Sequence, residues 1–114
     1  MKFLVTVTMD PSATSPAELQ SAMTDLVENE LKTGGFAVSG GLAPHADGVR
    51  VEVSPSGVVE SEARLPVHGF AVVDSSSLER ATEVATRMLR LHLEHVPDWA
   101  GSCEIRPIVT HCLP

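Results

Sequence analysis

Hydrophobic and polar residues repeat with the period of a strand in some stretches of the chain and with the period of a helix in others. These patterns predict where strands and helices lie. Runs rich in β-branched and apolar residues predict four strands, at residues 2–8 (KFLVTVT), 36–42 (FAVSGGL), 67–74 (VHGFAVVD) and 102–108 (SCEIRPI). A shorter alternating run at 49–53 (VRVEV) is followed by the turn SPSG and by 58–64 (VVESEAR). This pattern predicts a hairpin whose first strand is half-buried.

Two further stretches repeat apolar residues at helical spacing, and each has a start signal and a stop signal. The first stripe holds Leu19, Met23, Leu26, Val27 and Leu31, and the second holds Leu78, Ala81, Val84, Ala85, Met88 and Leu89. Ser15, which precedes a proline, predicts the first N-cap, and Gly34 predicts the end of that helix. Ser76 predicts the second N-cap, and Pro97 stops the second helix.

The resulting order is strand, helix, strand, hairpin, strand, helix, strand, which is the split βαβ pattern of a ferredoxin-like α+β sheet. Two helices cover only one face of such a sheet. On the last strand, Cys103 and Ile105 make an apolar side, whereas Glu104 and Arg106 lie on the other. The mixed side is too apolar for bulk water and too polar for a dry core. We therefore expect it to meet a second copy, with a pocket between the two sheets.

Composition narrows the class of protein. The chain has 114 residues, of which 43% are apolar, and we expect one domain over residues 1–114, with 109–114 as a C-terminal tail. The net charge of −7 and the scattered lysines and arginines argue against nucleic acid and anionic membranes as partners. No run is long enough for a transmembrane helix or a signal peptide, so a cytoplasmic location is expected. The two cysteines lack metal-type spacing and are expected to be reduced thiols.

Several segments resemble the YCII-related, DGPF-domain family: GGLAP at 40–44, then VRV, HGFAVVDSSSLERA at 68–81, and GSCEIRPI at 101–108. The resemblance covers the chain from the first strand to Ile108. The most specific segment is the last one, together with the spacing from the Gly-Phe pair to the second helix. Membership implies a ferredoxin-like fold that pairs into a dimeric α/β barrel, as in muconolactone isomerase and related small enzymes.

The chain also departs from that family. The Asp-Gly-Pro-Phe signature is expected near residues 57–60, which here read GVVE. The YCII branch places a histidine on the first helix, paired with an aspartate and proposed as catalytic, but Ala22 lies near that position. The family's acid/base pair therefore has no counterpart on the first helix of this chain, and any catalysis needs other residues.

Three residues are the leading catalytic candidates. His68 begins a strand and could be a general acid or base if it lies in a pocket. The alternative is that it has only a structural role at the end of the strand, where it caps the sheet. Arg106 on the mixed face could hold a carboxylate or enolate oxygen through its planar guanidinium, with Glu104 as its orienter. The alternative is that Glu104 and Arg106 only interact with each other on the strand, or that they form a salt bridge across a dimer.

Five further residues are candidates for a pocket lining: Thr6, His45, Arg50, Arg64 and Trp99. Thr6 belongs to the mixed side of the first strand, and His45 with Asp47 lies in a loop that could equally be a plain exposed turn. Trp99 could anchor an interface, close a pocket or pack over the last strand.

A metal and a cofactor are not expected. His92 and His95 form an H-x-x-H pair at the end of the second helix, and a zinc site there would need a third ligand. Glu94, Asp98, His111 or Cys112 could supply it. The alternative is that both histidines interact with the helix C-terminus, where the dipole favours positive charge.

Two functions stay open. One is a homodimeric, cofactor-independent enzyme that binds a small organic molecule between its sheets and performs isomerisation, cyclisation or elimination. His68 would be its base, Arg106 its oxyanion stabiliser and Glu104 its orienter. The other is a non-catalytic ligand-binding or regulatory interaction module. Family domains occur beside sigma-factor genes, and the missing signature is typical of a lost activity.

Overall fold

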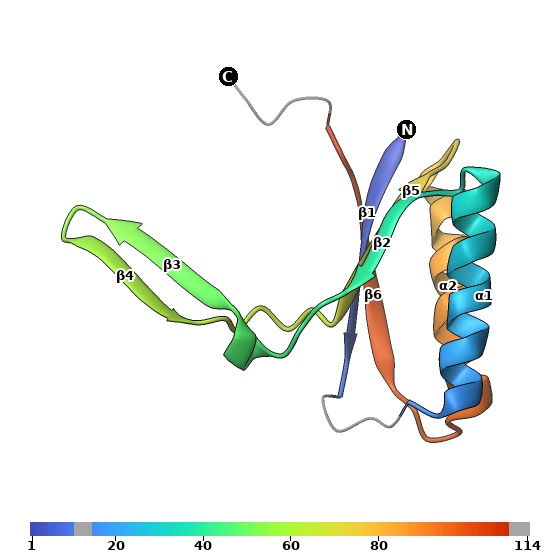
Figure 1. The fold of residues 1–114 in the computed structure, drawn as a ribbon. Coiled ribbons are helices and arrows are strands. Elements are labelled where there is room, and N and C mark those ends of the chain that lie inside the picture. Colours follow the sequence, from blue (N-terminus) through green and yellow to red (C-terminus); the bar gives the residue numbers. More distant parts are fainter. Residues whose placement is uncertain (11–14, 110–114) are drawn as a thin grey trace.

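A four-stranded antiparallel sheet carries two helices on one of its faces (Figure 1). This computed structural model describes residues 1–10 and 15–109. The sheet has the order β2-β5-β1-β6, with β1 at Lys2–Met9, β2 at Phe36–Gly41, β5 at Gly69–Asp74 and β6 at Gly101–Pro107. The helices are α1 (Ala17–Thr33) and α2 (Leu78–His95). The predicted α+β class is confirmed, and this strand order is compatible with a ferredoxin-like fold.

The hydrophobic core lies between the sheet and the helices. Phe3 and Val5 on β1 and Val73 on β5 are its largest fully buried side chains. They face α2 through small side chains, Ala81 and Ala85, which let the helix approach the sheet closely. The predicted helix stripes are correct in their centres. Their ends are not buried, because Leu31 is 44% exposed and Leu78 is 49% exposed.

The helix ends follow the predicted signals only in part. Gly34 ends α1 in the left-handed conformation, with φ of 84°, as predicted. The N-cap of α1 is Pro16 and has no side-chain hydrogen bond, so the prediction of a Ser15 cap was wrong. The N-cap of α2 is Ser77 rather than Ser76, and its Oγ accepts a hydrogen bond of 3.2 Å from the amide of Arg80.

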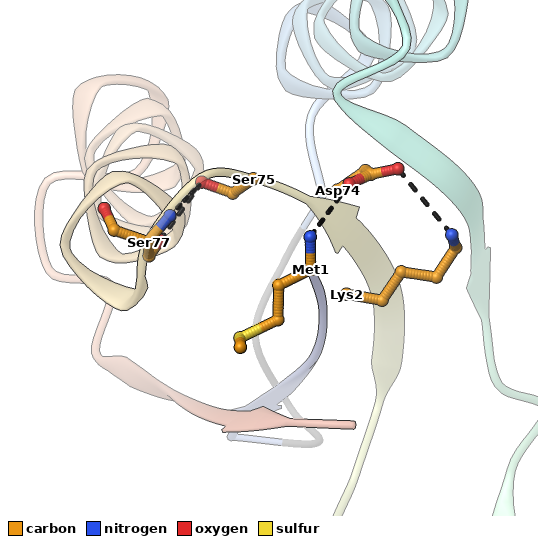
Figure 2. Close-up of polar contacts among 5 residues, drawn as sticks. All are labelled: Met1, Lys2, Asp74, Ser75 and Ser77. Carbon is orange, nitrogen blue, oxygen red and sulfur yellow. Dashed lines mark hydrogen bonds and ion pairs between the residues drawn. The ribbon is translucent and has the colours of Figure 1, made fainter. Parts of the chain in front are cut away.

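The junction between β5 and α2 is held by short polar contacts (Figure 2). The Asp74 carboxylate lies 3.6 Å from the amino group of Met1 and 3.7 Å from Nζ of Lys2. One residue further on, Ser75 Oγ donates to the carbonyl oxygen of Ser77 at 3.1 Å. The ion pairs join the start of β1 to the end of β5, and the serine contact lies in the turn before α2.

The predicted hairpin forms but does not pack on the body. β3 (Val49–Ser54) pairs with β4 (Gly57–Glu62), and this hairpin arm (residues 49–62) projects to the side of the sheet opposite the helices (Figure 1). Val53 is 75% exposed, so the expected half-burial of the first strand was wrong. The radius of gyration of 16.1 Å exceeds the value of about 13 Å for a compact chain of this length.

The second face of the sheet carries no covering element within the described residues. This open face includes Leu4 and Thr6 on β1, Phe70 and Val72 on β5, and Glu104 and Arg106 on β6. Its mixture of apolar and polar side chains confirms the parity predicted from the first and last strands. Within the described residues, no helix is long and apolar enough to cross a membrane.

Candidate functional site

A cavity of about 400 Å³ lies between the sheet and the two helices. Its lining comes from β1, β2, β5, α1 and α2, so both layers of the fold contribute. Most of the lining side chains are apolar: Val7, Met9, Met23, Val27, Ala71 and Met88. A larger hollow of about 640 Å³ runs along the outer side of α2 alone and has no wall from the sheet or from α1. Of these two hollows, the mostly apolar one between the layers is the better candidate for a binding site.

Two paired glycines leave part of the sheet side of this cavity free of side chains. Gly41 on β2 pairs with Gly69 on β5, which in turn pairs with Val7 on the helix-facing side of β1. A Cβ atom placed on Gly41 would meet nothing closer than the carbonyl oxygen of His68, at 4.0 Å. The missing side chains leave bare backbone at this point, and α1 and α2 form the opposite wall.

His68 lines this cavity at the start of β5. Its backbone extends the pairing of β5 with β1 through a bond of 2.7 Å to the carbonyl oxygen of Val7. Its ring is held by a hydrogen bond of 3.2 Å, which the amide of Met9 donates to Nδ1. An amide only donates, so Nδ1 must hold a lone pair, and the ring hydrogen is on Nε2. The neutral ring therefore has its hydrogen-bond donor at Nε2, and the residue borders the cavity.

His92 lines the same cavity from α2 and is only 9% exposed. Its Nδ1 lies 2.7 Å from the carbonyl oxygen of Met88, one turn earlier. A carbonyl only accepts, so Nδ1 carries the hydrogen here. Trp99 stacks on the His92 ring with a centroid separation of 4.7 Å, and a Cβ atom on Gly101 would overlap its indole. Trp99 therefore packs at the start of β6, which is one of its predicted roles, and supports the wall of the cavity from behind.

Polar side chains complete the lining. Ser39 on β2 already donates to the carbonyl oxygen of Phe70 at 3.3 Å. Thr24 and Glu28 lie on exposed positions of α1. They form the edge of the cavity rather than its interior, which leaves the two histidines as its inner polar groups.

Arg106 and Glu104 are not brought together with His68 in one chain. Glu104 pairs across β1 with Thr6 and Arg106 with Leu4, so the three candidate polar side chains share the open face, on the other side of the sheet from the cavity. Glu104 and Arg106 form no ion pair within the described residues. A joint action with His68 would need a different arrangement from the one in a single chain.

The remaining candidates lie at or near the hairpin arm. His45, in the short 3-10 turn η1 (His45–Asp47), donates from Nε2 to the carbonyl oxygen of Leu65 at 2.9 Å. Arg50 and Arg64 both approach Oε1 of Glu52, at 2.9 Å and 3.6 Å. All three side chains have local partners away from the cavity, and they stabilise the arm and its base.

The H-x-x-H pair of α2 does not form a metal-ligand cluster in the described residues. No group of three or more histidine, cysteine, aspartate or glutamate side chains there could hold an ion. His95 Nδ1 donates to the carbonyl oxygen of Leu91 at 3.0 Å, in the same way as His92 bonds one turn back. The proposed ligands His111 and Cys112 lie outside the described residues, as does the tail from residue 110.

Cys103 is a free thiol that packs against the core from β6. Burial raises its pKa above the ordinary range of a thiol, because a thiolate loses hydration in this apolar environment. A protonated thiol is a weak nucleophile, and Cys103 is not among the residues that line the cavity.

Sequence reasoning missed the cavity and the place of His92 in it. His92 continues the buried stripe of Ala81, Ala85 and Met88 at helical spacing, and that position could have indicated a buried ring. The paired glycines at the ends of β2 and β5 were a second signal, since an absent side chain beside a core leaves space.

No protein-family model matches the chain, and no curated protein matches it.

Proposed function

We propose that this protein binds a small, predominantly apolar organic molecule in the cavity between the sheet and the helices. The observation that carries the proposal is the cavity itself, with apolar walls from five elements and two imidazole rings among them. Ligand sites of small domains have this character: concave, mostly apolar, with a few oriented polar groups.

A cofactor-independent enzyme is the second candidate, and the position of His68 in the cavity wall favours it. Because Nδ1 of His68 accepts from Met9, the neutral ring presents Nε2–H to a ligand as a hydrogen-bond donor, which can stabilise a developing oxyanion but cannot act as a base at Nε2. Isomerisation, cyclisation and elimination next to a carbonyl group each build negative charge on an oxygen, which such a donor could stabilise. A non-catalytic binding module needs no such step.

The chain is further proposed to be a divergent relative of the YCII-related proteins that pairs as a homodimeric α/β barrel. Its sequence resemblance to that family supports this, and so does the apolar content of the open face, where Leu4 is 37% and Val38 45% exposed. The hairpin arm projects on the same side as that face (Figure 1). In such a pair, each hairpin arm would lie along the partner, and this contact would cover the exposed valines of the arm. Glu104 and Arg106 would face the second sheet.

Filling the cavity tests the binding proposal. Gly41→Val adds a side chain on the cavity side of β2, where the backbone φ is ordinary and a Cβ fits without overlap. We expect the affinity for propylbenzene, measured by saturation-transfer NMR and titration calorimetry, to fall by about tenfold or more. The stability should not fall, because valine favours strands.

Ala37→Val, on the same strand but outside the lining, is the matched control and should bind propylbenzene like the unmodified protein. Equal affinity in Gly41→Val and Ala37→Val would place any binding elsewhere and would refute the proposed site.

A further inference from the structure

Two histidines of opposite tautomer line one cavity. His68 accepts the Met9 amide at Nδ1, and His92 donates from Nδ1 to the Met88 carbonyl. Backbone groups cannot exchange these roles, so each bond determines where the hydrogen of the neutral ring is. The Nε2 atom of His68 is then a donor, and the Nε2 atom of His92 is an acceptor.

Both Nε2 atoms are available to a ligand. Neither makes a hydrogen bond to the part of the chain that the structure describes. Within that same part, no buried side-chain nitrogen or oxygen lacks a partner, so both Nε2 atoms keep access to the outside of the protein. The other lining groups are apolar, are satisfied like Ser39, or lie at the edge.

We propose that this pair selects apolar molecules that carry a hydroxyl group, such as phenols and alcohols. The hydroxyl oxygen accepts a hydrogen bond from Nε2 of His68, and a hydroxyl hydrogen is donated to Nε2 of His92. Ethers and ketones only accept and therefore satisfy His68 alone, and hydrocarbons satisfy neither ring. The inference rests on the proposed binding function and adds the chemical class of the ligand.

Selection of this kind arises because an unmatched polar group in an apolar site loses water without compensation. One matched hydrogen bond is expected to change affinity by about threefold to tenfold. The predicted order of affinity is therefore a hydroxyl compound first, its methyl ether second and the hydrocarbon last.

The tautomers are testable without a ligand. Nitrogen-15 NMR of the imidazole side chains should place the hydrogen on Nε2 in His68 and on Nδ1 in His92 when both rings are neutral. His95 has the same bond to a carbonyl one turn earlier as His92, and it should show the same tautomer as His92. Equal tautomers in His68 and His92 would overturn the inference.

The ligand class is tested with three probes of similar shape: 4-propylphenol, 4-propylanisole and propylbenzene. His→Asn substitutions are suited to this test, because the asparagine amide replaces Nδ1 and keeps the backbone bond while it removes Nε2. His92→Asn should abolish the preference for the phenol over the anisole. His68→Asn should abolish the preference for the anisole over propylbenzene.

His95→Asn is the matched control, since it removes the same group from the same helix outside the cavity. It should leave all three affinities unchanged. If the preference for the phenol over the anisole persists in His92→Asn, or the preference for the anisole over propylbenzene persists in His68→Asn, the inference is wrong.

The two proposals fail in different ways. If the unmodified protein binds all three probes with equal affinity, the cavity binds apolar molecules and only the hydroxyl selectivity is refuted. If none of the three probes binds, the proposed function is refuted together with the inference.

Discussion

At the scale of single residues, hydrogen-bond partners decide what a side chain can do. His68 was a candidate base on sequence grounds, because histidine is the side chain that most often serves as a general base. Its Nδ1 is occupied by the Met9 amide, so the neutral ring is a donor toward the cavity. That role depends on a contact between β1 and the residue before β5, which the spacing of residues does not reveal.

Cys103 gives a prediction with a definite sign in pH. Burial raises its pKa in the folded chain, so the unfolded chain loses the thiol proton first as the pH rises. The stabilising contribution of Cys103 is complete below the unfolded pKa and is lost as the pH rises through the folded pKa. In a Cys112→Ser background, urea unfolding of Cys103 and Cys103→Ala chains should therefore converge in alkaline solution.

The rate of thiol alkylation is a second test of the burial of Cys103. Iodoacetamide at pH 8 should modify Cys103 more slowly in the folded protein than in urea, as followed by mass spectrometry, because the thiolate is the reacting form. Equal rates in the two states would show that burial does not protect the thiol.

At the scale of elements, three consecutive serines precede α2, and only the structure separates them. Sequence reasoning chose Ser76 as the cap, whereas Ser77 accepts the Arg80 amide. We expect Ser77→Ala to lower the free energy of unfolding by about 1 kcal/mol, since it removes a capping acceptor. Chemical denaturation followed by circular dichroism measures this change.

Ser76→Ala is the matched control for that change. Ser76 is exposed and makes no capping bond, so its removal should leave stability nearly unchanged. A larger loss for Ser76→Ala than for Ser77→Ala would assign the cap to the residue that sequence reasoning chose.

Strand positions and faces were predictable because the period of two is a direct property of extended backbone. Cys103 and Ile105 face the core and Glu104 faces away, as the alternation indicated. The exposure of the hairpin arm was not predictable, because a hairpin that packs on one side and a hairpin in solvent have the same alternation. The cavity was missed for a related reason: a glycine such as Gly41 leaves no side-chain pattern to interpret.

At the scale of the whole molecule, the proposed homodimer predicts a mass in solution of twice the 12.1 kDa chain. Val72 lies on the open face between Leu4 and Val38. Val72→Glu would place a charge at the centre of a paired face but in solvent on a single chain. Light scattering after size-exclusion chromatography at micromolar concentration should therefore show the dimer for the unmodified chain and a single chain for this variant.

Ser21→Glu adds the same charge on an exposed position of α1 and should remain dimeric. A single-chain mass for the unmodified protein under these conditions would contradict the proposed pairing.

The arm also has a consequence for how the chain can diversify. Its excursion leaves and rejoins the sheet at one place, where the Leu42 amide donates to the His68 carbonyl at 2.9 Å. Because the two ends of this loop meet at its base, a change in the length of the loop does not move the two βαβ halves on either side of it. The hairpin arm is therefore a modular insertion: lineages could lengthen, shorten or replace residues 49–62 and change their choice of partner, while the cavity is inherited unaltered.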